Sequence, residues 1–292
     1  MKGIIFGAGG QLGREWMDQL NRGNVPLFDY YSGFGSDQLD ITDDRAVAEI
    51  LDAEMPDVVV NCAAYTDVDR AEDHRKVAVR VNGTAVKSLA GQCAEREIKL
   101  VHYSTDYVFP GRSEDRRRFP EGYPEDHETS PVNWYGATKL KGEQGVRQAG
   151  CEHLIIRVSW LCGFYGSNFI KTMLQLADQR SQLDVVDDQW GSPTFTGPVV
   201  QNTLSLLRNQ EQGVYHITSG GLTSWYELAC EIFRTSGHDI QVNPVSSDAF
   251  ETRAKRPRFS KLSTRKAAQV PGVIMPSWRE GLKNLLKKLN VE

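Results

Sequence analysis

Three short motifs hold the side chains of this sequence that could carry out chemistry. Gly7–Gly13, with the sequence GAGGQLG, follows the first apolar run, Ser104–Tyr107 follows a later one, and Tyr135–Lys139 opens a helical stretch. A glycine-rich turn at the start of a helix presents free N–H groups to an anion such as a pyrophosphate. The other two motifs supply a hydroxyl, a phenol and an ammonium. Together the three predict a nicotinamide-dependent oxidoreductase.

The phenol and the ammonium are four residues apart, which places Tyr135 and Lys139 on one face of a helix. A tyrosine has a reference pKa of about 10 and moves protons poorly at neutral pH unless its surroundings change that value. A nearby ammonium stabilises the phenolate, so we expect Lys139 to lower the pKa of Tyr135 and to hydrogen-bond the nicotinamide ribose. Thr105 could hold the substrate oxygen beside the phenol.

The glycine motif has the spacing Gly7, Gly10 and Gly13 at a strand–helix junction. This context favours a dinucleotide site over a ligand-free turn, which the same spacing also permits. Asp29 ends a second apolar run ~20 residues further on, where a carboxylate can accept hydrogen bonds from the adenine ribose and favour NAD. A surface acid fits Asp29 equally well, and Arg14 could instead hold the 2′-phosphate of NADP.

Strand-like and helical stretches alternate along the first half of the chain. The expected strands are residues 2–6, 25–28, 57–62, 99–103 and 153–158, and the expected helices are residues 11–20, 43–53, 77–97 and 135–148. Near-continuous apolar strands between helices indicate a parallel sheet covered on both faces, with ligands at the carboxyl ends of the strands. We therefore predict an α/β fold with a Rossmann-type doubly wound parallel sheet.

The pattern changes after about residue 163. Expected helices at 168–177, 199–207, 225–234 and 278–289 surround a short strand at 213–217. We predict that residues 1–163 form a dinucleotide-binding domain to which residues 194–217 return. Residues 164–193 and 218–292 are expected to form a smaller carboxyl-terminal substrate-binding lobe.

Composition excludes several classes of protein. The 292 residues are 40% apolar and 25% charged, with a formal net charge of −4, so no global charge attracts nucleic acid. No apolar run reaches the ~20 residues of a membrane span, and we expect no signal peptide. Five cysteines lack metal-ligand spacing, and their odd number fits a reducing cytoplasm.

Longer strings identify a family. Asn61–Glu72, Ser104–Phe109, Tyr135–Lys139, Arg157–Trp160 and Asp188–Thr194 resemble the extended short-chain dehydrogenase/reductases and, more narrowly, the dTDP-4-dehydrorhamnose reductases. The matching stretches span nearly the whole chain. The resemblance implies a cofactor, NADPH or NADH, and the reduction of the C4 keto group of a dTDP-4-keto-6-deoxyhexose, foremost dTDP-4-dehydro-L-rhamnose.

The resemblance also implies which residues do what. Thr105, Tyr135 and Lys139 would form the catalytic set, and Asp40 and Ile41 would flank the adenine ring. The residues expected to bind the cofactor are Gly7, Gly10, Gln11, Leu12, Gly13, Asp29, Asp40, Ile41, Ala63, Ala64, Tyr65, Asn82, Tyr135 and Lys139. The residues expected to bind the substrate are Thr66, Val68, Asp106, Tyr107, Trp160, Asn168, Gln189 and Arg256, although a solvated Arg256 fits its sequence context as well.

Two features depart from the family. Members can dimerise through an Mg²⁺ site that uses acids of the first helix and the second lobe. Glu15 matches the first-helix acid, but residues 196–201 lack the partner carboxylates. The insert at 111–124 is longer and more basic than usual. We therefore predict no metal ligands, and either a monomer or a homodimer.

Three other functions occur among proteins that resemble this chain. A 4,6-dehydratase needs an Asp-Glu pair after the threonine, and a coupled epimerase-reductase needs an acid–base pair such as Cys and His. Tyr107 stands where that glutamate or cysteine would be, so simple keto reduction is what the residues favour. A regulatory subunit that binds dinucleotide without turnover stays open as an alternative.

Overall fold

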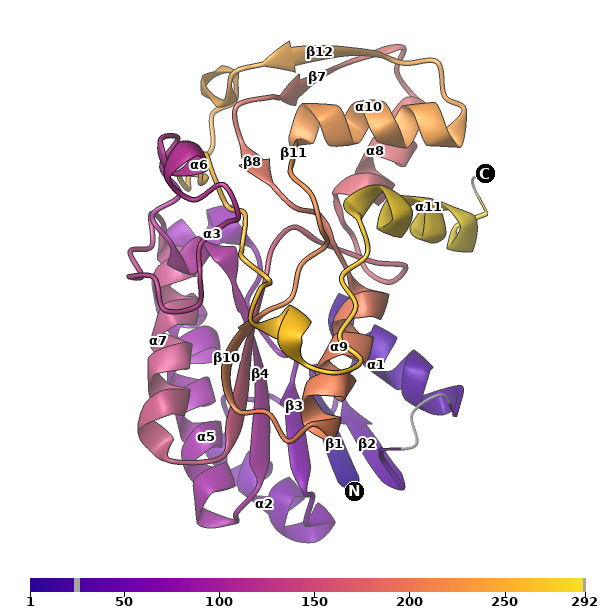
Figure 1. Cartoon of the computed structure of the whole chain (residues 1–292). Coiled ribbons are helices and arrows are strands. Elements are labelled where there is room, and N and C mark those ends of the chain that lie inside the picture. Colours follow the sequence, from indigo (N-terminus) through magenta and orange to yellow (C-terminus); the bar gives the residue numbers. More distant parts are fainter. Residues whose placement is uncertain (24–26, 291–292) are drawn as a thin grey trace.

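A six-stranded parallel sheet forms the centre of the larger lobe in the computed structural model, which describes residues 1–23 and 27–290 (Figure 1). Its strands in spatial order are β10 (Gly213–His216), β5 (His153–Val158), β4 (Lys99–Thr105), β3 (Val58–Asn61), β1 (Lys2–Phe6) and β2 (Tyr30–Phe34). Every neighbouring pair is parallel. The chain winds outward from β1 in both directions, which confirms the predicted doubly wound sheet.

Helices cover both faces of this sheet because successive strand residues point to opposite sides. Ile5 packs into one core with residues of α1 (Gln11–Asn21) and α9 (Thr196–Arg208). Ile4 packs into a second core with α2 (Asp44–Glu54), α5 (Ala85–Glu95) and α7 (Trp134–Ala149). The fully buried strands explain why the sequence shows continuous apolar runs rather than alternation.

The smaller lobe lies at the carboxyl edge of the sheet (Figure 1). It contains α8 (Phe169–Ala177), α10 (Trp225–Ser236), α11 (Trp278–Lys288) and the pairs β7 (Gln182–Val186) with β12 (Gln241–Val245) and β8 (Trp190–Gly191) with β11 (Thr223–Ser224). Its helices share a third core. Ser224 and Glu227 form a capping box at the start of α10, which fixes where that helix begins.

The remaining elements are short. They are α3 (Val68–Asp73), α4 (Arg75–Val79), the π-helical turn η1 (Arg80–Thr84), the 3₁₀ turn η2 (Asp106–Val108), α6 (Asp115–Arg118), the pair β6 (Leu161–Cys162) with β9 (Thr194–Phe195), and the 3₁₀ turns η3 (Ser247–Ala249) and η4 (Ala267–Gln269). The basic insert forms α6, and its Arg116 guanidinium lies 3.5 Å from the ring centre of Trp190 in the smaller lobe. The insert therefore braces the lobes against each other.

Residues 194–217 lie with the larger lobe, because α9 packs on α1 and β10 pairs with β5. Ala267 and Val270 also join the core beneath the sheet. The carboxyl-terminal segment therefore crosses back more than once, and the exact domain boundaries stay a prediction.

Two expected elements differ in the structure. Residues 25 and 26 lie outside the described residues, Leu27 and Phe28 are not in a strand, and the second strand is β2 at Tyr30–Phe34. β2 is an edge strand with half-exposed polar residues, so it lacks the apolar signature of the central strands. The single helix expected at 77–97 is interrupted by η1, which carries the buried Asn82. Such one-turn π-helices are frequent at functional sites.

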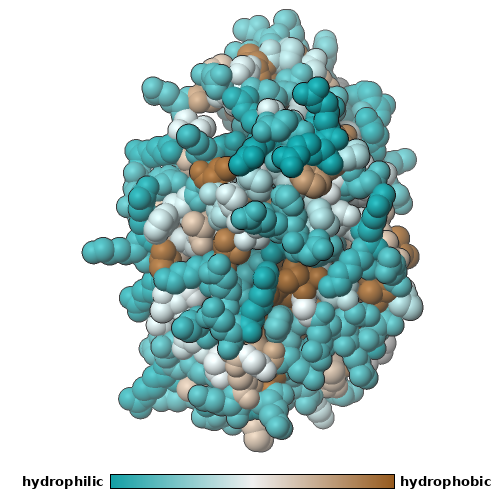
Figure 2. Space-filling view, turned by 60° about the vertical axis from the view of Figure 1, so that its left-hand side comes forward, coloured by the Kyte–Doolittle hydropathy of each residue, from teal (hydrophilic) through white to brown (hydrophobic). Residues whose placement is uncertain are grey.

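The surface is mainly hydrophilic on the face that Figure 2 shows, with apolar side chains in separate patches. Within residues 1–23 and 27–290, no helix combines the length and apolarity needed to cross a bilayer.

Candidate active site

The glycine turn between β1 and α1 forms one wall of a cavity of about 440 Å³. Gly7 has a φ of +75°, and a Cβ there would lie 2.5 Å from the backbone nitrogen of Ala63. A Cβ at Gly13 would lie 2.2 Å from the carbonyl oxygen of Gly7, so Gly13 lets the helix pack onto the turn. At Gly10 the space is more open, with the nearest atom 3.3 Å away. The turn is therefore shaped for a backbone to approach a ligand.

The far end of this cavity suits an adenosine. Asp40, Ile41, Leu39 and Ser36 line it, together with Phe34 at the end of β2. The hydrogen bond from the backbone N–H of Thr42 is the largest cause that lowers the pKa of Asp40. Asp40 is therefore available as a carboxylate acceptor, and its contact with an adenine amine stays a prediction.

Asp29 lies at the opposite edge of the sheet. It precedes β2, and its carboxylate is 2.7 Å from the amino-terminal ammonium of Met1. Parallel strands present ligands at their carboxyl ends, so Asp29 cannot reach a ribose held by the glycine turn. The expected role of Asp29 is wrong because the second strand begins after this residue rather than ending at it. The preference for NAD that rested on Asp29 loses its basis.

The turn after β3 closes the cavity with Ala63 and Ala64. Tyr65 is held by Asn82, whose Oδ1 accepts from the Tyr65 N–H at 2.8 Å and whose Nδ2 donates to the Tyr65 carbonyl at 2.9 Å. Asn82 also donates to the Thr138 hydroxyl at 3.0 Å. The side chain of Asn82 is thus engaged by the protein, and it positions the wall of the cavity.

The three expected catalytic side chains come from two elements that meet at the carboxyl edge of the sheet. Thr105 ends β4, and α7 carries Tyr135 and Lys139 one turn apart. Asn133 caps α7 by accepting from the Gly136 N–H at 2.8 Å. A Cβ at Gly136 would lie 2.2 Å from the Tyr107 carbonyl oxygen, so this glycine lets the first turn of α7 press against η2.

Burial dominates the electrostatics of these groups. It raises the pKa of Tyr135, and the Asp106 charge raises it further, while the Thr105 hydroxyl partly offsets both. Tyr135 is therefore a neutral phenol at pH 7, in the state that a proton donor requires. Burial also lowers the pKa of Lys139 to about 8. The expectation that Lys139 lowers the pKa of Tyr135 is wrong in this structure, because burial of the phenolate raises that pKa.

Lys139 is instead held by the backbone of β4. Its Nζ donates to the carbonyl oxygen of Tyr103 at 2.6 Å. One turn further along α7, Glu143 forms a buried two-pronged ion pair with Arg157 of β5, at 2.9 and 2.8 Å. The Glu143 carboxylate raises the pKa of Lys139 and so favours the ammonium. This anchor holds the reactive face of α7 against the sheet.

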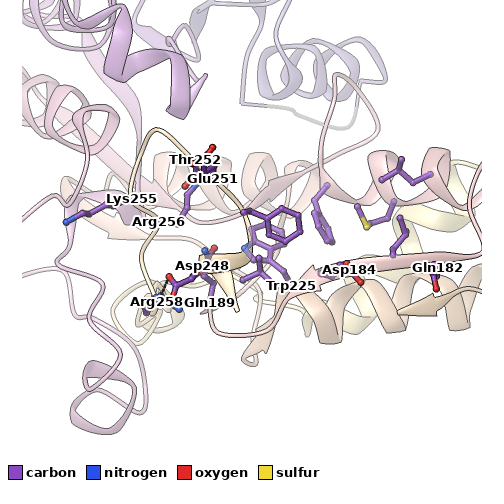
Figure 3. Close-up of a pocket in the computed structure, with 18 of the residues that line it drawn as sticks. Gln182, Asp184, Gln189, Trp225, Asp248, Glu251, Thr252, Lys255, Arg256 and Arg258 are labelled. Atoms are coloured by element: carbon purple, nitrogen blue, oxygen red, sulfur yellow. Dashed lines mark hydrogen bonds and ion pairs between the residues drawn. The ribbon is translucent and has the colours of Figure 1, made fainter. Parts of the chain in front are cut away.

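A second, larger cavity of about 1110 Å³ is lined by residues of the smaller lobe and of the segment after β12, and by Tyr107 of the larger lobe. Tyr107 joins it to the catalytic group, because the Tyr107 and Tyr135 rings meet edge to face with centres 5.6 Å apart. Figure 3 shows Arg258, Asp248 and Gln189 together at one end, and Gln182 and Asp184 along β7 at the other. The mixture of cationic, amide and aromatic groups suits an anionic nucleotide.

Arg256 and Arg258, in the segment after β12, line this cavity. Arg256 pairs with Asp69 of α3 at 2.6 Å, and Arg258 pairs with Asp188 and with Asp248. The cationic groups lining the cavity are Arg180, Lys255, Arg256 and Arg258. Of these four, the sequence assigned only Arg256 to the substrate.

Trp225 lines the large cavity and was not expected from the sequence. Its ring stacks on Trp160 with centres 3.5 Å apart. Trp225 lies on the same stripe of α10 as the buried Leu228 and Ile232, which is the spacing of a core residue. Trp160, which has a φ of +46°, covers one face of its ring.

Other expected substrate residues lie around rather than in this cavity. Asn168 caps α8 and donates to the side chain of Gln11 at 2.9 Å, so it bridges the lobes. Thr66 is exposed after β3, and Val68 opens α3. Leu12 of α1, which was expected at the cofactor and not at the substrate, is buried in the core. Contacts of these four with a ligand stay predictions.

The residues that would hold the family's Mg²⁺ do not suit a metal here. Glu15 and Asp18 of α1 each lie 3.6 Å from the Nζ of Lys288 on α11. In the described ranges, 1–23 and 27–290, no group of three acidic, histidine or cysteine side chains could hold an ion. The ammonium of Lys288 supplies the positive charge beside these two carboxylates, at the seam between α1 and α11.

Comparison with known proteins agrees with this geometry. A family model described as RmlD substrate binding domain matches residues 1–291. The chain is 40% identical to a dTDP-4-keto-6-deoxy-D-glucose reductase of Streptomyces niveus, over 99% of this chain and 98% of that protein. It is 37% identical to a dTDP-4-dehydrorhamnose reductase of Escherichia coli K12, over 98% and 97%.

A solved structure shows the same fold at similar identity. The dTDP-4-dehydrorhamnose reductase of Bacillus anthracis in complex with NADP superposes with a TM-score of 0.92 and 38% identity, covering 98% of this chain and 99% of that one. The chain therefore belongs to the dTDP-4-dehydrorhamnose reductase family.

Proposed function

We propose that the protein reduces the C4 keto group of a dTDP-4-keto-6-deoxyhexose, foremost dTDP-4-dehydro-L-rhamnose, with NADPH or NADH. The observation that carries the proposal is the contact of Tyr107, which lines the large cavity, with Tyr135 of the catalytic group, whose ring centre lies 5.6 Å away. An anionic-ligand pocket thus reaches a phenol that is neutral at pH 7, and the glycine turn of the cofactor cavity lies at the same carboxyl end of the sheet. The names of the relatives give the substrate class.

The roles follow from the positions of the side chains. The reduced nicotinamide supplies a hydride when it is bound. Tyr135 gives its proton to the oxygen that becomes an alkoxide. The sequence placed Thr105 on that same oxygen, but its hydroxyl faces Asp106 and Tyr135, so we assign Thr105 to the oxygen of Tyr135. Lys139, fixed by the Tyr103 carbonyl, places its remaining N–H donors toward the cofactor ribose. Tyr107 and Gln189 orient the sugar nucleotide.

The charges over the large cavity select the nucleotide. A diphosphate would draw on Arg256 and Lys255, which line the cavity. Trp225 and Trp160 would pack against the flat parts of the ligand. The five free thiols fit a reducing compartment, and we place the reaction in the cytoplasm.

Turnover of two substrates by the purified protein tests the proposal. We expect loss of the absorbance of NADPH or NADH with dTDP-4-dehydro-L-rhamnose. A dTDP-4-keto-6-deoxy-D-glucose arm is needed because the Streptomyces niveus relative carries that name. A higher kcat/KM in that arm would move the assignment to the other sugar. Binding of both ligands without turnover would favour a regulatory subunit.

A further inference from the structure

Asp106 is a buried carboxyl group next to the catalytic threonine, and the reaction assigned above leaves it without a task. It begins η2, directly after Thr105, and only 3% of it is exposed. Its Oδ1 accepts from the Thr105 hydroxyl at 2.9 Å. Its Oδ2 is buried without a hydrogen-bond partner in the described part of the chain, and so is the Oγ of Ser260.

Thr105 has one hydroxyl proton and two neighbours that can take it. Its oxygen accepts from the Tyr107 N–H at 3.2 Å, and its proton points to the Asp106 Oδ1 at 2.9 Å. The same hydroxyl faces Tyr135, because it lowers the pKa of that phenol. If Asp106 is ionised, the proton points to Asp106, and Tyr135 must donate to Thr105. If Asp106 is neutral, it donates to Thr105, and Thr105 donates to Tyr135. The two states reverse the direction of the whole chain of hydrogen bonds.

Only the second direction suits a reduction. A phenol whose proton is committed to Thr105 cannot give that proton to the substrate. A phenol that accepts from Thr105 has its proton free, and the phenolate left behind is stabilised by the same hydrogen bond. We propose that Asp106 works as a neutral carboxylic acid that sets the direction of the Thr105–Tyr135 hydrogen bond.

The surroundings support a neutral Asp106. Burial raises its pKa to about 7, although the Thr105 hydroxyl, backbone N–H groups and the nearby Ser260 hydroxyl, which makes no hydrogen bond of good geometry, offset this in part. Tyr107 and Tyr135 are the titratable groups that face it, and burial raises the pKa of both. Arg256 and Asp69, which are paired with each other, face Tyr107. Asp106 therefore titrates in the range where the protein would work.

Protons balance without a further reactant. The O–H bond of Tyr135 breaks as the O–H bond of the product forms, and the phenolate takes a proton from solvent before the next cycle. Asp106 keeps its proton throughout. It is thus a positioning residue that acts through Thr105.

The pH dependence of kcat in the parent protein and in Asp106→Asn tests this, since the inference rests on the proposed reaction. The parent should lose kcat as pH rises through about 7, because the carboxyl group loses its proton there. Asp106→Asn can donate at every pH, so its kcat should show no decline near pH 7 and should exceed that of Asp106→Ala. Asp106→Ala should lose kcat by about 10²-fold, as expected for one missing donor.

Two results would overturn the inference. One is an Asp106→Asn as inactive as Asp106→Ala while both bind cofactor like the parent, which would mean that the carboxyl group itself transfers a proton. The other is a decline near pH 7 that persists in Asp106→Asn, which would assign it to Lys139, whose pKa is about 8.

Infrared spectroscopy separates this inference from the assigned reaction. The parent should show a protonated-carboxyl band that disappears as pH rises through about 7 and is absent in Asp106→Asn. If the band is present but no 4-keto sugar turns over, the proposed function fails and the neutral Asp106 stands. If turnover occurs and the band is missing, the assignment of Asp106 fails alone.

Discussion

The two cavities are built from different materials. The cofactor cavity combines the glycine turn after β1 with the segments after β2 and β3, and all its lining residues lie between Phe6 and Val81. The large cavity is closed by ion pairs between residues far apart, such as Arg256 with Asp69, 187 positions away. The first arrangement fixes where a reaction happens, and the second fixes which ligand is held. Variants in the two regions should therefore fail in different ways.

The largest effect is expected at Tyr135, the phenol of the catalytic group. Tyr135→Phe keeps the ring and removes the proton donor, so kcat should fall by about 10²–10⁴. Cofactor affinity should stay unchanged in calorimetry. Lys139→Met is the matched comparison, because it should weaken cofactor binding as well. Full activity of Tyr135→Phe would remove the phenol from the mechanism.

Substitutions of two glycines in the turn after β1 should affect folding and cofactor binding separately. Gly13→Ala puts a Cβ 2.2 Å from a carbonyl oxygen, and the overpacking should cost about 1–3 kcal/mol in the free energy of unfolding. Gly10→Ala has more room and should unfold like the parent in urea, but bind NADPH at least about tenfold more weakly. Equal binding by Gly10→Ala would show that the ligand does not approach this turn.

Substitutions of residues that line the large cavity should change KM more than kcat. Arg256→Gln removes a charge that lines the cavity, and KM for the dTDP-sugar should rise about tenfold with kcat nearly unchanged. Arg253→Gln is the control, since Arg253 pairs with Asp73 on the same two segments but does not line the cavity. Equal changes in both variants would mean that the pairs only hold the lobes together.

The smallest effect is expected at the seam of α1 and α11. Lys288→Met removes its contacts with Glu15 and Asp18 and should lower the free energy of unfolding by about 0–1 kcal/mol, since the lysine is one-third exposed. Mg²⁺ should not change the melting temperature of the parent. A rise in that temperature with Mg²⁺ would show that a metal can displace the lysine.

Elements with strong local signals could be predicted from the sequence. The strand at 153–158 has the expected bounds because it is a continuous apolar run, and the helix expected at 11–20 is α1 because its buried positions repeat with the helical period. β2 could not be predicted, because this half-buried edge strand mixes Tyr, Ser and Gly and carries no continuous apolar run. β7 and β12 pair across almost 60 residues; β7 alternates exposed and buried positions over only five residues, and β12 shows no clear alternation.

The sequence by itself determined the chemistry of this protein. Glycine spacing, the threonine at the end of a strand and the four-residue step from Tyr135 to Lys139 are local features, and local geometry follows from local residues. Tertiary structure alone decided that Asp29 lies at the wrong edge of the sheet and that Trp225 stacks on Trp160. It also decided the buried state of Asp106. Burial and charge pairing depend on segments brought together by folding, and these set the pKa values on which a proton transfer depends.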